Sequence, residues 1–267
     1  LGKSALESMR RHEFSVPIDN NQLNAFVEDF LSGTPRDVFI KYVTNNIPKI
    51  NIERQHQKEE AEQFPLLDFI RTTTFDSSGN PIKNVGMGKD AEHQKLMYSM
   101  YKRMIISAVF LRIEVTKMEE KKILSKDVIL DEFKDSLLIS KTQFGIFERG
   151  IEAYFDHDYL VTCHLLIPLF ESTIRRLTAF QGGQILRQSK DPLNGNEYIA
   201  LDSLLDCNEI KNLLKEDVQM YFKNLFTDQN GWNLRNLTSH GLIQTNEFNS
   251  TTADRIVHAF CLLSMIK

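Results

Sequence analysis

The sequence predicts an all-α protein that contains one small β-hairpin. Glycine (12) and proline (7) are both scarce among the 267 residues, which argues against collagen, low-complexity disorder and turn-rich all-β folds. Apolar residues recur at helical spacing through most of the chain. The exception is residues 66–85, where β-prone residues flank the turn cluster at 76–81. This segment predicts a small hairpin or an ordered loop.

Six helices are expected in the part of the chain that precedes its most apolar segment. Thr34 precedes a proline and starts one of them, and the very polar residues 53–63 predict a helix that faces solvent. The expected helices cover residues 21–30, 34–43, 53–63, 90–117, 125–138 (starting at Ser125 or Asp127) and 142–155. Residues 86–89 (Gly-Met-Gly-Lys) lack the glycine spacing of a phosphate-binding loop, so we reject that reading.

Residues 158–180 are hydrophobic nearly all round and stop at Gly182-Gly183, which predicts the central helix. A loop is expected at 190–196, and residues 206–209 resemble a capping box that starts a helix ending near Phe226. A short helix or turn should end at Gly241, and a last helix should run from Thr251 to the end. We divide the chain into an N-terminal helical region with the hairpin (1–86), a helical connector (87–141) and a C-terminal bundle (142–267).

Composition limits the function classes. Lys+Arg 32 against Asp+Glu 36 gives a net charge of −4, so a nucleic-acid site would have to be local. Three cysteines without a C-x-x-C pair argue against a disulfide framework or a zinc ribbon and suggest a reducing, cytoplasmic location. No apolar run reaches the roughly 18–20 residues that span a membrane, and no signal peptide is visible. The start at Leu1 leaves open that the chain is a piece of a longer one.

The most informative stretch is residues 235–241, which read Arg-Asn-Leu-Thr-Ser-His-Gly. In a helix, Asn236 and His240 share a face. Arg235 lies five residues before His240 and starts on another face, but its long side chain can reach toward the imidazole, and a tighter or irregular turn would help. Arginine offers planar donors suited to phosphate oxygens, and histidine exchanges a proton near neutral pH. Together they are the minimum set for phosphodiester cleavage without a metal.

The pattern Arg235-Asn236-x-x-x-His240-Gly241 resembles the R-N-x-x-x-H-G signature of a family long labelled as of unknown function. That family is similar to a branch of the HEPN superfamily (higher eukaryotes and prokaryotes nucleotide-binding domains). HEPN domains are small all-α bundles, many with an R-x(4–6)-H motif and a polar residue after the arginine. Residues 166–175 also resemble the family's central helix, where an acidic residue and an arginine lie one turn apart. The resemblance covers residues 142–267.

The resemblance implies a ribonuclease that needs no metal or other cofactor and acts as a homodimer, often as a toxin or antiviral defence effector. Arg235, Asn236 and His240 would be its catalytic residues, and two copies of the motif would face each other across a two-fold axis. His240 would take the proton from the RNA 2′-hydroxyl, Arg235 would stabilise the phosphorane, and Asn236 would orient the phosphate or His240. The RNA, the trigger and any regulatory partner stay unnamed.

Glu171 and Arg175 are candidates for supporting or RNA-binding roles. A carboxylate on so apolar a helix is costly unless it is paired. Glu171 can pair with Arg175 one turn on, or it can reach Arg235 and hold it. Arg175, Arg176 and Arg187 form either a local RNA-facing patch or ordinary surface charge.

Two other functions fit parts of the sequence. A HEPN-fold domain without catalysis would bind nucleotides, RNA or a protein, with Arg235 paired to a carboxylate. Alternatively, His157-Asp158 is a doublet typical of helical HD phosphohydrolases, with His93 and Asp202 or Asp206 as further metal ligands. The spacing favours a helix cap at 156–158 instead. Residues 1–85 are long enough to sense a trigger or restrain a nuclease.

Overall fold

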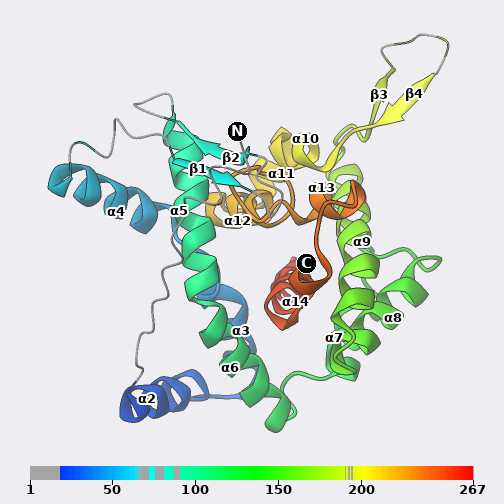
Figure 1. Cartoon of the computed structure of the whole chain (residues 1–267). Helices are drawn as coiled ribbons and strands as arrows, with labels where there is room; N and C mark the ends of the chain where they lie inside the picture. The colour runs from blue at the N-terminus through cyan, green and yellow to red at the C-terminus, as the bar shows by residue number, and fades with distance from the viewer. Residues whose placement is uncertain are drawn as a thin grey trace.

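The protein is built almost entirely of helices, with two small antiparallel hairpins, as the computed structural model in Figure 1 shows. The structure describes residues 19–64, 66, 72–75, 81–86, 91–189, 191, 193 and 195–266. The elements are α2 (Asn20–Phe30), α3 (Pro35–Asn45), α4 (Ile50–Gln63), β1 (Thr72–Phe75), β2 (Pro81–Val85), α5 (Glu92–Ile106), α6 (Ala108–Glu120), α7 (Lys126–Lys134), α8 (Phe144–Phe155), α9 (Tyr159–Phe180), β3 (Leu186–Gln188), β4 (Asn196–Tyr198), α10 (Leu201–Asp206), α11 (Asn208–Leu213), α12 (Glu216–Phe226), α13 (Leu234–Ser239), the 3₁₀ turn η4 (Thr245–Glu247) and α14 (Ser250–Leu263). The predicted all-α fold class is confirmed.

Among the described residues, five helices (α2, α3, α7, α9 and α14) begin where polar side chains satisfy the free N–H groups of the first turn. Thr34 and Asp37 form a capping box, in which the Asp37 carboxylate accepts from the Thr34 N–H at 2.9 Å. Ser125 accepts from the Val128 N–H, and Asp158 accepts from the Val161 N–H at 3.2 Å. These starts of α3, α7 and α9 lie where the sequence predicts them.

The hairpin predicted within residues 66–85 is present as β1 and β2, which pair with Thr72 opposite Val85. The β-prone residues 69–71, the turn at 76–80 and the residues 87–89 of the rejected phosphate loop lie outside the described part of the chain. The hairpin contacts the helical body through Lys83. Its Nζ donates to the backbone oxygen of Gly231 and lies 3.7 Å from the centre of the Tyr101 ring.

The helix predicted over 90–117 is wrong in its continuity, because the chain breaks at Ser107 into α5 and α6. The apolar stripe runs across the break, so periodicity does not reveal it. A tertiary contact occupies this point. The buried guanidinium of Arg255 donates to the Met104 oxygen at 3.0 Å and to the Ser107 hydroxyl at 2.7 Å.

The continuous helix predicted from 206 to 226 is also wrong. It is two helices, α11 and α12, separated by the extended residues Leu214 and Lys215. The residues at 206–209 form no side-chain cap on α11, whose first turn starts at the backbone of Cys207. Tertiary burial of Ile210 in α11 and of Leu214 in the break itself decides the path.

The polar helix predicted at 53–63 exists as α4 but is not wholly solvent-facing. Glu53 is buried, and its carboxylate accepts from the Ser99 hydroxyl and from the Arg103 guanidinium on α5. A buried carboxylate is tolerated because both oxygens are paired. The partners come from 46 and 50 residues along the chain, beyond the reach of a local pattern.

Helix α9 is central, as predicted, and packs mainly against α8 and α14 (Figure 1). Its Phe170 ring stacks on Phe226 of α12 with the ring centres 3.9 Å apart. One hydrophobic core includes Tyr42, Leu111 and Phe260. The three predicted segments therefore contribute to a shared core.

The hairpin formed by β3 and β4 has no counterpart in the prediction, which has only a loop at 190–196. Its strands are short and largely exposed, with Leu186 opposite Tyr198. It projects from the helical body beside the C-terminal end of α9 (Figure 1).

None of the helices in the part of the chain that the structure describes combines the length and the hydropathy needed to cross a membrane.

Candidate active site

The motif at 235–241 lies on α13, and a tight turn sets the direction of this helix. Gly231 packs so closely on α12 that an added Cβ would lie 2.2 Å from the Asn224 oxygen. The same oxygen accepts from the Trp232 N–H at 2.7 Å. Asn233 then takes a left-handed conformation (φ +55°), which asparagine tolerates better than most residues. The buried Leu234 fixes the first turn of α13.

Arg235 is paired with Glu171 of the central helix. The Arg235 Nε donates to Glu171 Oε2 at 2.7 Å, across 64 residues of sequence. The Glu171 side chain is 13% exposed, and that of Arg235 is 29% exposed. A charge-assisted bond to a mostly buried carboxylate holds the guanidinium in one orientation.

Arg175 shares the same carboxylate. Its Nη2 donates to the other oxygen, Glu171 Oε1, at 2.6 Å and also to the Ile199 oxygen at 3.3 Å. Glu171 therefore binds both Arg175 and Arg235, the two partners that the sequence allows for it. Two arginines around one carboxylate leave an excess positive charge, which suits an anionic ligand.

Asn236 connects Arg235 to the turn that precedes α13. Its Oδ1 accepts from Arg235 Nη1 at 3.2 Å, which orients the amide. Its Nδ2 donates to Asn233 Oδ1 at 2.7 Å and to the Thr227 oxygen at 3.2 Å. The amide therefore contacts Arg235 and the turn, and it makes no hydrogen bond to His240.

His240 ends α13. Its backbone N–H donates to the Asn236 oxygen at 3.0 Å, so it lies one helical turn after Asn236. Gly241 follows in a left-handed conformation (φ +65°), which ends the helix as predicted. The imidazole is exposed and has no hydrogen-bond partner among the described residues. It is free to meet a ligand from solvent.

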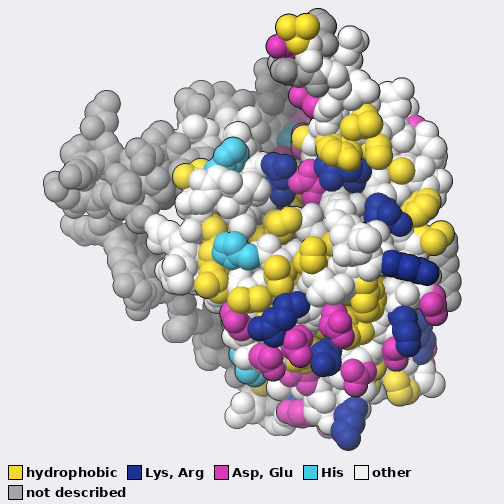
Figure 2. Space-filling model, turned by 90° about the vertical axis from the view of Figure 1, so that its right-hand side faces the viewer, with side chains coloured by type: hydrophobic (Ala, Val, Ile, Leu, Met, Phe, Trp, Pro, Cys, Tyr) yellow, Lys and Arg dark blue, Asp and Glu magenta, His cyan; other side chains and the backbone are white. Residues whose placement is uncertain are grey.

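Figure 2 shows the face of the molecule that carries α7, α8 and α9, below the projecting hairpin. In its upper half, basic side chains lie on either side of an acidic one, with hydrophobic side chains next to them. Histidine side chains reach the surface on the same face. Basic side chains therefore gather in the upper half of this face, while its lower half mixes acidic and basic side chains.

The structure brings four of the five predicted site residues into one bonded cluster: Arg235, Asn236, Glu171 and Arg175. His240 lies on the same short helix without a bond to that cluster. Sequence reasoning missed Asn233, because no local signal ties it to the amide of Asn236. Arg187 pairs with Glu197 across the β3–β4 hairpin, so it belongs to a separate surface pair.

The HD doublet, His157 and Asp158, lies at the N-terminal end of α9. Asp158 caps α9, and His157 Nδ1 lies 3.0 Å from the Tyr159 hydroxyl. His93 bonds Asp228 at 2.9 Å instead of approaching the doublet. Among the described residues, no group of three or more His, Cys, Asp or Glu side chains is placed to share a metal ion.

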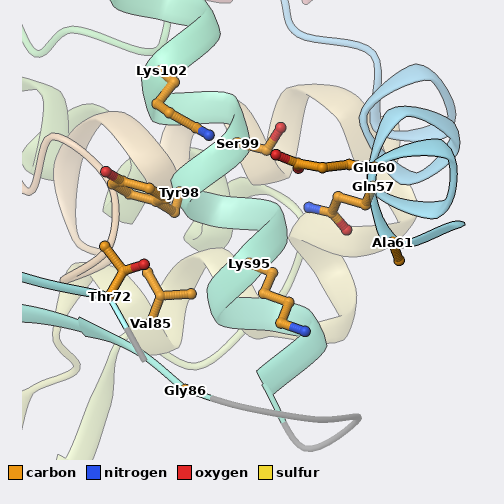
Figure 3. A pocket seen from close by; sticks show the side chains of 10 residues that line it. All are labelled: Gln57, Glu60, Ala61, Thr72, Val85, Gly86, Lys95, Tyr98, Ser99 and Lys102. Carbon is orange, nitrogen blue, oxygen red and sulfur yellow. The ribbon is translucent and has the colours of Figure 1, made fainter. Parts of the chain in front are cut away.

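A cavity of about 190 Å³ lies between α4, α5 and the first hairpin (Figure 3). Tyr98, Ser99 and Lys102 of α5 line it, with Gln57 and Glu60 of α4 on the opposite wall. Its walls mix cations with a carboxylate and thus favour no single ligand charge. It lies on the α4 side of the fold, away from α9 and α13 (Figure 1).

Comparison of the chain with protein-family models, with curated proteins and with solved structures finds no significant match.

Proposed function

We propose that this protein is a metal-independent RNA endonuclease of the HEPN type. One observation supports this most: Arg235 is oriented by Glu171 and Asn236, five residues before an exposed histidine that has no hydrogen-bond partner among the described residues. An arginine with a purely structural role would need no contact beyond its ion pair with a carboxylate. Here the guanidinium keeps Nη2 without a partner in the described residues, and it is partly open to solvent.

In the proposed reaction, His240 removes the proton from an RNA 2′-hydroxyl, and the oxygen attacks the adjacent phosphorus. Arg235 stabilises the charge that develops on the phosphorane oxygens. The bond to the 5′-oxygen breaks, and that oxygen receives a proton. The products are a 2′,3′-cyclic phosphate and a 5′-hydroxyl, and DNA is not a substrate because it lacks the 2′-hydroxyl.

A homodimer supplies the second proton transfer in this proposal. His240 of a second copy protonates the leaving 5′-oxygen across the two-fold axis. The exposure of residues 239–242, at and just after the C-terminal end of α13, supports such an arrangement, because a partner can approach it. We further propose a cytoplasmic role as a toxin or antiviral defence effector.

The test is cleavage of labelled RNA in EDTA, with an all-DNA strand of the same sequence as the control. The parent protein is expected to cut RNA and leave cyclic phosphate ends. Arg235→Ala is expected to lower kcat by about 10²–10³-fold, the range found for loss of one donor to a developing oxyanion. Arg235→Lys recovers only part of this, because an ammonium lacks the planar pair of donors. Equal cutting of DNA, or an unchanged rate in Arg235→Ala, contradicts the proposal.

A second candidate is a HEPN-fold module that binds RNA or a protein without cutting it. The bond between Arg235 and Glu171 favours it, because that pairing is what a purely structural motif requires. RNA binding by the parent without any cleavage would identify this alternative.

A further inference from the structure

A cavity of about 380 Å³ opens beside the Glu171 cluster, between the C-terminal half of α9 and the β3–β4 hairpin. Its volume is within the roughly 300–1,000 Å³ typical of small-molecule sites. The residues around it combine two aromatic rings, two guanidinium groups, a hydroxyl and an apolar floor. The main ones are Ser172, Arg175, Arg176, Phe180, Ile185 and Tyr198.

Both aromatic rings are unusually open to solvent. Tyr198 is 66% exposed and Phe180 is 50% exposed. Phe180 is the last residue of α9, and Tyr198 is the last residue of β4. Two exposed rings from separate elements that line one cavity offer flat apolar surfaces that the protein covers only in part.

Each ring is accompanied by an arginine that is fixed to the backbone. Arg175 lies 5.0 Å from the centre of the Tyr198 ring and donates to the Ile199 oxygen. Arg176 lies 5.4 Å from the centre of the Phe180 ring and donates through Nε and Nη2 to the Leu137 oxygen. These contacts are present before any ligand binds, which lowers the ordering cost of binding.

We propose that this cavity holds one unstacked base of a single-stranded RNA, with Phe180 and Tyr198 as stacking surfaces and Arg175 and Arg176 as contacts to the flanking phosphates. Aromatic rings beside basic groups are the usual means of binding single strands, since every base has a flat face. Bases of an A-form duplex stay stacked and cannot enter such a cavity. The positive charge favours a polyanion over an apolar segment of a protein.

The cavity is joined to the proposed catalytic cluster by one residue. Arg175 lines the cavity and shares the Glu171 carboxylate with Arg235. A base in the cavity therefore lies close to the linkage that Arg235 contacts. This inference rests on the proposed function for its placement near the cut, but base binding itself is measured without cleavage.

The experiment uses the full chain and a short 2′-O-methyl RNA, which has normal bases and phosphates but no free 2′-hydroxyl to support cleavage. Binding is followed by fluorescence anisotropy, against a duplex of the same sequence. Tyr198→Ala and Phe180→Ala are each expected to weaken binding by about 10-fold or more, and Tyr198→Phe to retain it. Phe64→Ala is the matched control. Phe64 is 57% exposed, directly after the distant helix α4, and its replacement should leave binding unchanged.

Parallel measurements separate the possible failures. Parent-like binding by Tyr198→Ala and Phe180→Ala, or equal affinity for the duplex, overturns the cavity proposal. If His240→Ala stops the cleavage of ordinary RNA but Tyr198→Ala does not, the cavity proposal is overturned and the ribonuclease proposal stands. Tyr198-dependent binding without cleavage supports the cavity and overturns the ribonuclease. A change from dimer to monomer in Tyr198→Ala, measured by light scattering, identifies a protein interface and overturns base binding.

Discussion

Two regions of this molecule contain the same three chemical groups, an arginine, a carboxylate and a histidine, in opposite environments. On α14, Asp254, Arg255 and His258 are fully buried. At the junction of α9 and α13, Glu171 and Arg235 are partly exposed, and His240 is exposed. The same groups therefore serve different purposes according to their access to water.

In the buried set, both charged side chains are bound to other parts of the protein, although Asp254 Oδ2 and Arg255 Nε have no hydrogen-bond partner among the described residues. The Asp254 carboxylate accepts from Arg112 at 2.8 Å and from the Tyr154 hydroxyl at 2.7 Å. Burial, and then the charge of Arg255, lower the pKa of His258 to about 3, so that it stays neutral near pH 7. His258 is a weak base at this pKa, and no ligand can reach it because it is fully buried. His240 is exposed to solvent, which is why we assign catalysis to the exposed set and stability to the buried one.

The largest expected effect is on the buried set. Arg255→Ala removes a fully buried guanidinium that donates to Asn46, Met104 and Ser107. The cavity and the orphaned acceptors should lower the free energy of unfolding by about 4 kcal/mol, measured by urea denaturation. Arg149→Ala, which breaks only a surface pair with Glu152, is the matched control, with a loss below about 0.5 kcal/mol. Equal losses of unfolding free energy in Arg255→Ala and Arg149→Ala would contradict the assignment of stability to the buried set.

The next effect is on activity at the exposed set. Glu171→Gln keeps the shape of the side chain but removes the charge that orients Arg235. We expect kcat for RNA cleavage to fall by up to about 100-fold, because the guanidinium is no longer held in place. KM should rise less than kcat falls, since Glu171 does not touch the substrate and acts only by orienting Arg235 and Arg175.

A purely structural role for Glu171 predicts a different pattern. It would lower the unfolding midpoint in urea and leave the kcat of the folded fraction unchanged. Glu152→Gln, on a surface pair, is the matched control and should leave both quantities as in the parent.

A smaller effect concerns the pH dependence of stability. Burial raises the pKa of Glu114 from 4.5 to about 7, against the opposing hydrogen bond from Asn46. A carboxyl whose pKa is raised in the folded state contributes its full stability below pH 4.5 and loses it as pH rises through 7. The free energy of unfolding of Glu114→Gln, taken relative to that of the parent, should therefore rise by about 2 kcal/mol from pH 5 to pH 8.

This gain is measured as the difference in urea unfolding free energy between variant and parent at the two pH values. His258 titrates in an overlapping range with the opposite sign, but it is present in both proteins and cancels in the difference. A difference that does not change with pH would show that Glu114 is ionised in the folded protein throughout.

Local signals in the sequence predicted the helix ends well. Thr34, Asp158 and Gly241 act through their own backbone neighbourhood, so their effects follow from residues within one turn. The breaks at Ser107 and at Leu214 were missed, because contacts from distant residues decide them. The β3–β4 hairpin was missed since its short strands do not alternate apolar and polar residues.

For the candidate site, the residue types and the short helix were predictable from the motif at 235–241. The choice between Arg175 and Arg235 as partner of Glu171 was not, because it depends on where α13 packs against α9. The structure shows that both arginines bind the carboxylate. The cavity with Tyr198 also depends on that packing, since its walls come from two elements.

The most direct measurement compares RNA cleavage by the parent and by His240→Ala in EDTA, at equal concentrations of folded protein. Loss of a general base typically costs 10²–10⁴-fold. We predict that His240→Ala cuts RNA at least about 100-fold more slowly than the parent and binds it with similar affinity. Cleavage at the parent rate by His240→Ala would contradict the assignment of the exposed histidine as the proton acceptor.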